Sequence, residues 1–137
     1  MSRAFFGVAV LCTTLLFVGC DDAPTAPTPE VPVITESFSG TLTINGAITH
    51  PFVVGTPAAV TATLTAVSPD NTIPIGISLG TWSTQFETCQ VVISNDLASE
   101  GRTIVGSAQT AGAFCVRAYD TGRLTEPTSY TLVVEHK

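Results

Sequence analysis

The chain is poor in basic residues and in the residue patterns that build metal or catalytic sites. It has 5 Lys and Arg against 11 Asp and Glu, and only 2 histidines. Five positive charges are too few to form the basic patch that nucleic-acid binding needs. We therefore expect no nucleic-acid partner. No HExxH, CxxC or DxDxDG motif occurs. We therefore expect no resident metal, no cofactor and no enzyme activity.

The N-terminus has the pattern of a secretory signal peptide. Arg3 precedes an apolar stretch, residues 4–18, and Gly19-Cys20 follows it. As a helix this stretch would rise about 22 Å, short of the roughly 30 Å hydrocarbon core, which argues against a transmembrane span. The order resembles a bacterial lipoprotein signal, although Phe17 stands where that family usually has leucine. A simple cleaved signal and a retained helix remain the alternatives.

The resemblance implies where the protein is held. In bacterial lipoproteins the cysteine at the end of the signal is acylated and becomes the first residue of the mature chain, here Cys20. The lipid bilayer would be its partner, on the periplasmic side of the inner membrane or at the outer membrane. Removing residues 1–19 leaves 118 residues with a net charge of −7, enough for one modest domain.

Residues 21–32 read as a tether between the anchor and the domain. The segment, DDAPTAPTPEVP, has four prolines and almost no bulky apolar residue. Such a sequence cannot pack and should be extended and disordered, spanning up to about 37 Å at about 3.1 Å per residue. We expect a signal at 1–19, an acylated tether at 20–34 and a folded domain at 35–137.

Two cysteines, Cys89 and Cys115, remain after the signal and the anchor are set aside. An even pair in an oxidising compartment predicts a disulfide, worth about 3 kcal/mol in the chain-entropy model. A metal or redox pair is the alternative, but CxxC spacing and histidine support are missing. Cys115 alternates away from Phe114 and Val116, so the bridge requires Cys89 to lie at a loop end.

The domain shows the period-two alternation of β-strands, with turn residues between short segments and no helical period. Asn45-Gly46 predicts a hairpin with a type I′ turn, and Pro51 and Pro74 favour edge strands. We expect Ala66 and Ile44 to share the core-facing phase of their strands. The pattern predicts an all-β, antiparallel, jelly-roll-like sandwich of about eight strands, at residues 38–44, 47–54, 58–67, 73–79, 89–94, 102–109, 113–119 and 130–134.

Several strand motifs resemble the bacterial pre-peptidase C-terminal domain, a small jelly-roll-like sandwich. Gly40-Thr41-Leu42 and Phe52-Val53-Val54 match its first strands, while residues 111–120 (AGAFCVRAYD) and 129–134 (SYTLVV) match its last two. These are packing signatures. The family's acidic middle strand is here residues 73–79 (IPIGISL), without the aspartates, so no calcium role carries over from the resemblance.

Candidate ligand contacts are few. We place Trp82 and Phe86 in a loop, residues 80–88, where they would form a stacking platform for a sugar or peptide, or else cap the core. Arg117 is expected to pair with an outer-face acid. His50 is expected to be structural or exposed, and His136 to lie in a frayed terminus.

Loop acids leave two further questions open. Calcium binding by the loop from Asn95 to Gly101 together with Asp120, with Asp96 and Glu100 as further ligands, requires the two loops to meet at one end of the sandwich. A carboxylate pair for glycoside hydrolysis is not indicated. The sequence therefore favours an envelope-anchored, non-catalytic sandwich with an accessory or binding role. A carbohydrate- or matrix-protein-binding module acting through Trp82 is the alternative.

Overall fold

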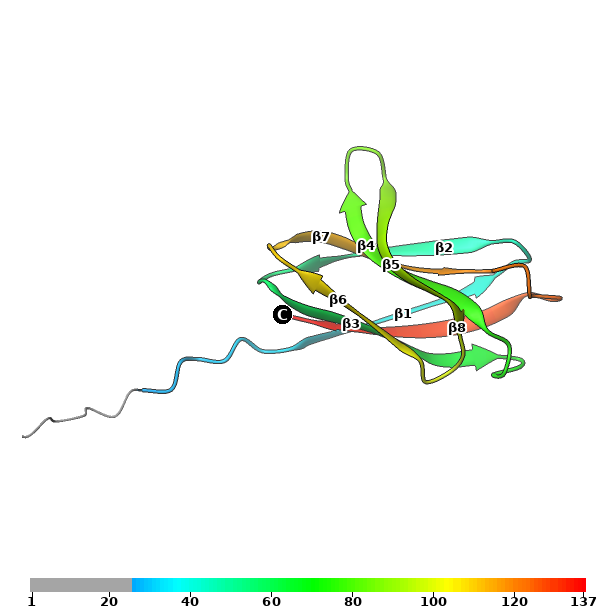
Figure 1. Ribbon diagram of the computed structural model, residues 1–137, viewed down its shortest axis with the longest axis horizontal. Coiled ribbons are helices and arrows are strands. Elements are labelled where there is room, and N and C mark those ends of the chain that lie inside the picture. Colours follow the sequence, from blue (N-terminus) through cyan, green and yellow to red (C-terminus); the bar gives the residue numbers. More distant parts are fainter. Residues whose placement is uncertain (1–25) are drawn as a thin grey trace, which may run out of the picture.

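The computed structural model describes residues 26–137, and its ordered part is all β. Eight antiparallel strands form two four-stranded sheets (Figure 1). The predicted sandwich of about eight strands is confirmed. The expected signal peptide and Cys20 lie outside the described residues, and no helix long and apolar enough to cross a membrane occurs in the part the structure describes. The strands are β1 (Ile34–Leu42), β2 (Ala47–Val54), β3 (Ala58–Ser68), β4 (Ile75–Ser83), β5 (Thr88–Ala98), β6 (Thr103–Ala108), β7 (Gly112–Tyr119) and β8 (Thr128–His136).

The strand order is that of a jelly roll. The first sheet has the order β1-β8-β3-β6 and the second has β2-β7-β4-β5. Only β4 and β5 are neighbours both in sequence and in a sheet, so at every other connection the chain crosses from one sheet to the other. Two sheets packed face to face in this way bury a core between their inner faces and leave two outer faces in solvent.

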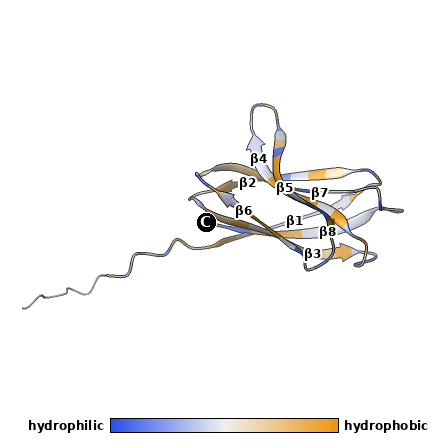
Figure 2. Ribbon diagram, in the orientation of Figure 1, coloured by the Kyte–Doolittle hydropathy of each residue, from blue (hydrophilic) through white to orange (hydrophobic). Residues whose placement is uncertain are grey.

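The core consists of aliphatic residues from both inner faces, as the alternation predicts. The most hydrophobic segments, orange in Figure 2, lie on the strands. Ile44 is an exception, since it is 51% exposed in the turn after β1 instead of continuing the apolar face. Fully buried members are Leu42, Val54, Ala62, Leu64, Ile75, Ile77, Ala98, Val116, Ala118, Leu132 and Val134.

β-Bulges reverse the phase of two strands. In β3 the register shifts between Leu64 and Ala66, so Ala66 is exposed and Val67 returns to the core. The expectation that Ala66 faces inward is therefore wrong. A bulge inserts one unpaired residue, and every side chain beyond it changes face. In β5, Ile93 pairs with Leu79 but Val91 pairs with Gly80, so the residue between them is the inserted one.

The turn at Asn45-Gly46 forms, but it joins two different sheets. Asn45 has a φ of 58°, and the Gly46 amide donates to the Thr43 carbonyl over 2.8 Å. The predicted hairpin and its type I′ geometry are wrong, because only Asn45 has positive φ and β1 pairs with β8. A single residue with positive φ at the third position is the geometry of a type II turn.

Element boundaries differ from the predictions around the second sheet. β2, with Pro51, lies at an edge as expected, but β4 is a central strand and Pro74 precedes it. The predicted loop at 80–88 shrinks to residues 84–87, because β4 continues through Trp82 to Ser83. The predicted loop at 95–101 likewise belongs to β5 as far as Ala98.

The C-terminal strand is secured along its whole length. β8 pairs with all of β1, from Ile34 opposite His136 to Leu42 opposite Thr128. His136 is 2% exposed, and its Nε2 lies 2.8 Å from Glu36 Oε1. The expectation of a frayed terminus is therefore wrong. Residues 26–33, which precede β1, have no regular secondary structure and are exposed.

Candidate functional site

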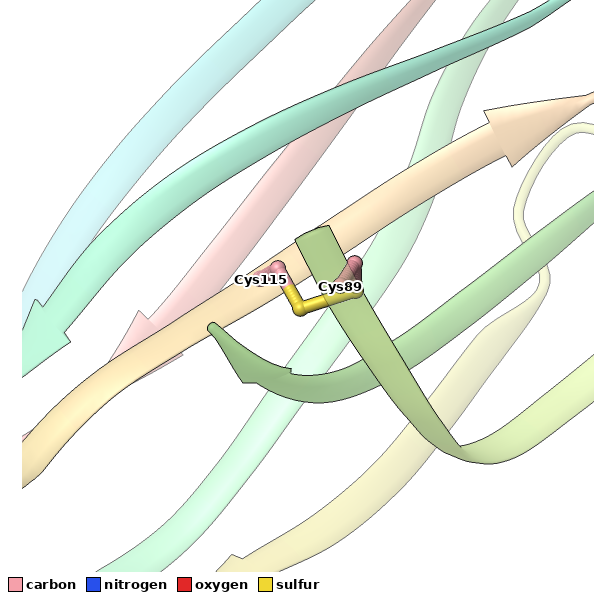
Figure 3. The surroundings of a disulfide bond; sticks show 2 residues. All are labelled: Cys89 and Cys115. Atoms are coloured by element: carbon pink, nitrogen blue, oxygen red, sulfur yellow. A yellow bond between two sulfur atoms is a disulfide. The ribbon is translucent and has the colours of Figure 1, made fainter. Parts of the chain in front are cut away.

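The paired ends of β4 and β5 form a hairpin that rises from the second sheet (Figure 1). A disulfide between Cys89 of β5 and Cys115 of β7 ties this hairpin to the sheet (Figure 3). The predicted bridge is confirmed. Cys89 is the second residue of β5, close to the 84–87 loop as expected, and is already paired with Trp82 of β4. The bulge in β5 makes the bridge possible, because it puts Cys89 and Val91 on the face opposite Ile93, the face that Cys115 also occupies.

Two glycines of β4 let neighbouring groups lie directly on the outer face of the second sheet. A Cβ on Gly80 would meet the Gln90 carbonyl oxygen of β5 at 2.1 Å. A Cβ on Gly76 would lie 2.2 Å from the ring of Tyr119. Only glycine permits such approaches, so these two positions allow β5 to bend across β4 and the tyrosine to lie flat.

A hollow of about 320 Å³ lies on this outer face beside the hairpin. We call it the Trp82 hollow. Its wall comes from the ends of β4 and β5, and its floor comes from β2 and β7. A mixture of one indole, two opposite charges and hydroxyls is suited to a small polar ligand with an apolar face. The lining residues are Ala47, Thr49, Trp82, Glu87, Thr88, Cys89 and Arg117.

Arg117 is the half-buried arginine of the described chain, since Arg102 and Arg123 are exposed. Its guanidinium carbon lies 5.4 Å from the centre of the Tyr119 ring, within the range of a cation–π contact. Among residues 26–137 it forms no ion pair, so the expected outer-face charge pair is wrong. Glu87 lines the same hollow without pairing with it.

The ring of Tyr119 supports the Arg117 guanidinium on one side through the cation–π contact. The Tyr119 hydroxyl donates to Asp96 Oδ1 of β5, which links β7, across β4, to the edge strand β5. Burial, followed by the hydrogen bond to Asp96, raises the pKa of Tyr119, while the charge of Arg117 lowers it to a smaller extent. The phenol therefore remains neutral at physiological pH and presents its ring to the guanidinium.

The two predicted aromatic residues have different positions. Trp82 is half-buried at the end of β4 and lines the hollow. Phe86 is 68% exposed at the hairpin tip and does not line it. The sequence analysis did not identify Arg117, Thr49 and Glu87 as residues that line the same hollow as Trp82. A usable signal was present: Arg117 shares a face with Cys115, and Cys115 is bonded to the partner of Trp82.

Sequence reasoning also missed that Ser78 lies in a GxSxG pattern, Gly76 to Gly80, the spacing of the hydrolase nucleophile elbow. That motif requires an exposed serine on a tight turn between a strand and a helix. Here Ser78 lies in the middle of β4, is fully buried, and its Oγ has no hydrogen-bond partner. The glycines on either side have the packing roles described above, so the pattern does not have the geometry of a nucleophile elbow.

The candidate calcium ligands accept hydrogen bonds from backbone amides of the protein. Asn95 accepts from the Leu97 amide, and Glu100 accepts from the Val67 amide at 3.2 Å. Asp120 accepts four amide hydrogen bonds, from Asn45, Gly122, Arg123 and Leu124. Burial alone raises the pKa of Asp120. The four amide hydrogen bonds together lower this pKa by more than burial raises it, so the net shift is downward. Within residues 26–137 no three His, Cys, Asp or Glu residues gather as a metal site would require.

His50 is part of a packed aromatic group on the inner side of β2. Its ring stacks on Phe38 with centres 5.1 Å apart, and its Nε2 lies 2.8 Å from the Tyr130 hydroxyl. Burial lowers the pKa of His50 and raises that of Tyr130 to about 12. These groups lie between the sheets, away from the Trp82 hollow.

Comparison with known proteins supports the fold. No family model and no curated protein matches the sequence. Among solved structures, the crystal structure of the Yersinia pseudotuberculosis-derived mitogen superposes with a TM-score of 0.53 at 14% sequence identity. The match covers 76% of this chain and 86% of the mitogen. At this identity the similarity concerns the arrangement of the strands.

Proposed function

We propose that the protein is an exported lipoprotein, held at the cell envelope by an acylated Cys20, whose non-catalytic sandwich binds a glycan in the Trp82 hollow. The observation that supports glycan binding is the composition of the Trp82 hollow. It combines an indole for stacking on a sugar ring with hydrogen-bonding groups of both polarities, on Arg117, Glu87 and Thr49. Stacking plus a few oriented polar groups is the usual composition of a small-ligand site.

The position of the hollow favours a sugar over an extended peptide. Peptides commonly add a strand to an exposed sheet edge, where backbone groups are free. The hollow instead lies over a sheet face, where the side chains of β2 and β7 form its floor. The nearest edge strand, β2, also contains Pro51, which cannot donate a ladder hydrogen bond. An envelope or matrix protein remains the second candidate ligand.

Several features support the envelope location. The lipoprotein-like signal precedes a proline-rich segment, and residues 26–33 are exposed without regular structure. A disulfide fits an oxidising compartment.

The binding proposal is tested on arrays of glycans and envelope proteins. We expect the full chain to bind at least one glycan, and Trp82→Ala to lose that binding at least tenfold. Phe86→Ala is the matched control, because it removes an exposed aromatic residue of the same hairpin outside the hollow. Glycan binding that survives Trp82→Ala would disprove the site, and binding only to proteins would favour the second candidate.

The anchor is tested separately. Cells supplied with labelled palmitate should incorporate the label into the wild-type chain and not into Cys20→Ser. The wild-type chain should fractionate with membranes, whereas the variant should be released. Equal labelling of the two chains would contradict acylation at Cys20.

A further inference from the structure

We infer that the ligand of the Trp82 hollow is an acidic glycan, whose sugar carboxylate is bound by Arg117. This inference rests on the proposed function and adds the chemical class of the sugar. It depends on the charge of Arg117, which no other residue of the described chain neutralises.

Arg117 is a partly buried cation that forms no ion pair within residues 26–137. Removing a charge from water costs free energy unless an opposite charge or several hydrogen bonds compensate it. The chain has 11 acidic residues, and none of those described forms an ion pair with Arg117. Arg102 and Arg123 are unpaired too, but they are exposed and remain hydrated. Among the cationic residues of the described part, 26–137, Arg117 alone combines partial burial, no acid partner and a position in the Trp82 hollow.

The guanidinium of Arg117 is held in place before any ligand arrives. Tyr119 supports it from one side at 5.4 Å, and the hydrogen bond to Asp96 fixes Tyr119 in turn. Tyr119 also lies against Gly76, so its ring has little room to move. A guanidinium fork fixed in this way matches a planar carboxylate, which can accept two parallel hydrogen bonds.

The Trp82 hollow also contains a negatively charged residue, Glu87. Glu87 is exposed at the rim, on the hairpin, while Arg117 belongs to the floor, on β7. The two do not pair, so both are available to a ligand. A hexuronate ring satisfies both: its apolar face lies on Trp82, its carboxylate meets Arg117, and its hydroxyls donate to Glu87. A neutral sugar would leave the guanidinium without an anion.

The experiment compares acidic sugars with their neutral counterparts. The full chain, purified in detergent micelles, is titrated calorimetrically with short oligomers of galacturonate, glucuronate, mannuronate and guluronate. Each oligomer is paired with its carboxyl-reduced form, which keeps the ring and loses the charge. We expect at least one uronate oligomer to bind about tenfold or more tightly than its reduced form, because hydrogen bonds to charged groups contribute more than neutral ones.

Variants assign that preference to a residue. Arg117→Gln should bring the acidic and reduced oligomers to equal affinity, and Arg117→Lys should keep part of the preference. Arg102→Gln removes an equal charge beside the first sheet and should leave the preference unchanged. Trp82→Ala should weaken the binding of both the acidic and the reduced oligomers.

Failure of the inference and failure of the proposed function give different results. Binding that depends on Trp82 but is equal for acidic and reduced oligomers would overturn the acidic ligand and leave the glycan site standing. A uronate preference that persists in Arg117→Gln would also overturn it. If no oligomer binds in a manner that depends on Trp82, the acidic ligand is overturned, and the proposed function falls too when the glycan array also shows no binding that depends on Trp82.

Discussion

The two outer faces of the sandwich satisfy their polar groups in different ways. On the first sheet, hydroxyls of adjacent strands bond to one another: Ser39 to Thr131 and Thr41 to Ser129 at 3.0 Å, and Thr63 to Thr103 at 2.9 Å. On the second sheet, no acid among residues 26–137 pairs with Arg117, and the buried Ser78 hydroxyl has no hydrogen-bond partner among the same residues.

This difference indicates where a ligand can gain free energy. A face whose polar groups already pair offers a ligand little beyond what water offers. A face with a fixed, unpaired charge and an indole beside a hollow offers interactions that the chain itself does not use. The disulfide and the hairpin belong to this second face, so it should also be the one more sensitive to substitution.

The largest effect should come from breaking the disulfide. Replacing Cys89 and Cys115 together by alanine removes a crosslink between residues 26 apart in sequence. We expect the free energy of unfolding to fall by about 3 kcal/mol and the melting temperature by roughly 10 °C or more, measured by thermal and denaturant unfolding. A loss below about 1 kcal/mol would contradict the view that the bridge stabilises the second face.

A smaller loss should follow from filling one glycine of that face. Gly80→Ala places a methyl group against the Gln90 carbonyl oxygen, so β5 must shift, and we expect a destabilisation of about 1–3 kcal/mol. Gly106→Ala in β6 is the matched control. Its new Cβ would meet Leu79 no closer than 3.6 Å, an ordinary contact, so the change in stability should be small. Equal losses in denaturant unfolding would contradict the close approach at Gly80.

Alkaline titration should distinguish the second face from the interior through the two tyrosines. The pKa of Tyr130 rises from 10.0 to about 12, while the pKa of Tyr119 rises less. We expect Tyr119 to ionise first by ultraviolet absorbance. The unfolded chain loses the Tyr130 proton near pH 10, before the folded chain does, so stability should fall as the pH rises from 10 towards 12. Tyr130→Phe should remove much of this pH dependence; an unchanged profile would assign it elsewhere.

The smallest effect is expected on the first face. Thr63→Val with Thr103→Val removes both partners of one exposed hydroxyl pair and keeps the side-chain shape. Because replacing both partners together leaves no unpaired polar group, the free energy of unfolding should change by less than about 1 kcal/mol. A larger loss would show that the hydroxyl pairs matter more than the comparison implies.

The alternation of residues predicted the fold because the inner faces of both sheets are apolar over most of their length. The errors arise where one residue interrupts the alternation. The bulges at Thr65 and Val92 are set by pairing with other strands, and no local signal marks them, so Ala66 and the face of Cys89 were misassigned. The turn at Asn45 was found locally, but the partner of the following strand depends on the whole topology.

The candidate site was predictable only in part. Trp82 could be selected because it is the single tryptophan, and the disulfide because two cysteines remain. Arg117 could be placed on the face of Cys115 from the alternation, but the sequence does not show which acids lie near it. The hollow exists because β5 bends over β4 at Gly80, and that bend is a long-range property of the fold.

The crosslink between β5 and β7 also has a mechanical consequence. A ligand held against the hairpin transmits any pull to Cys89, and from there through a covalent bond to Cys115. The load therefore enters the second sheet at β7, which lies between β2 and β4, and the hydrogen bonds of the edge strand β5 do not have to bear it. On the other side, in the proposed lipoprotein a pull through residues 26–33 would reach β1, an edge strand that pairs only with β8. Under tension β1 should detach first, while the ligand remains bound.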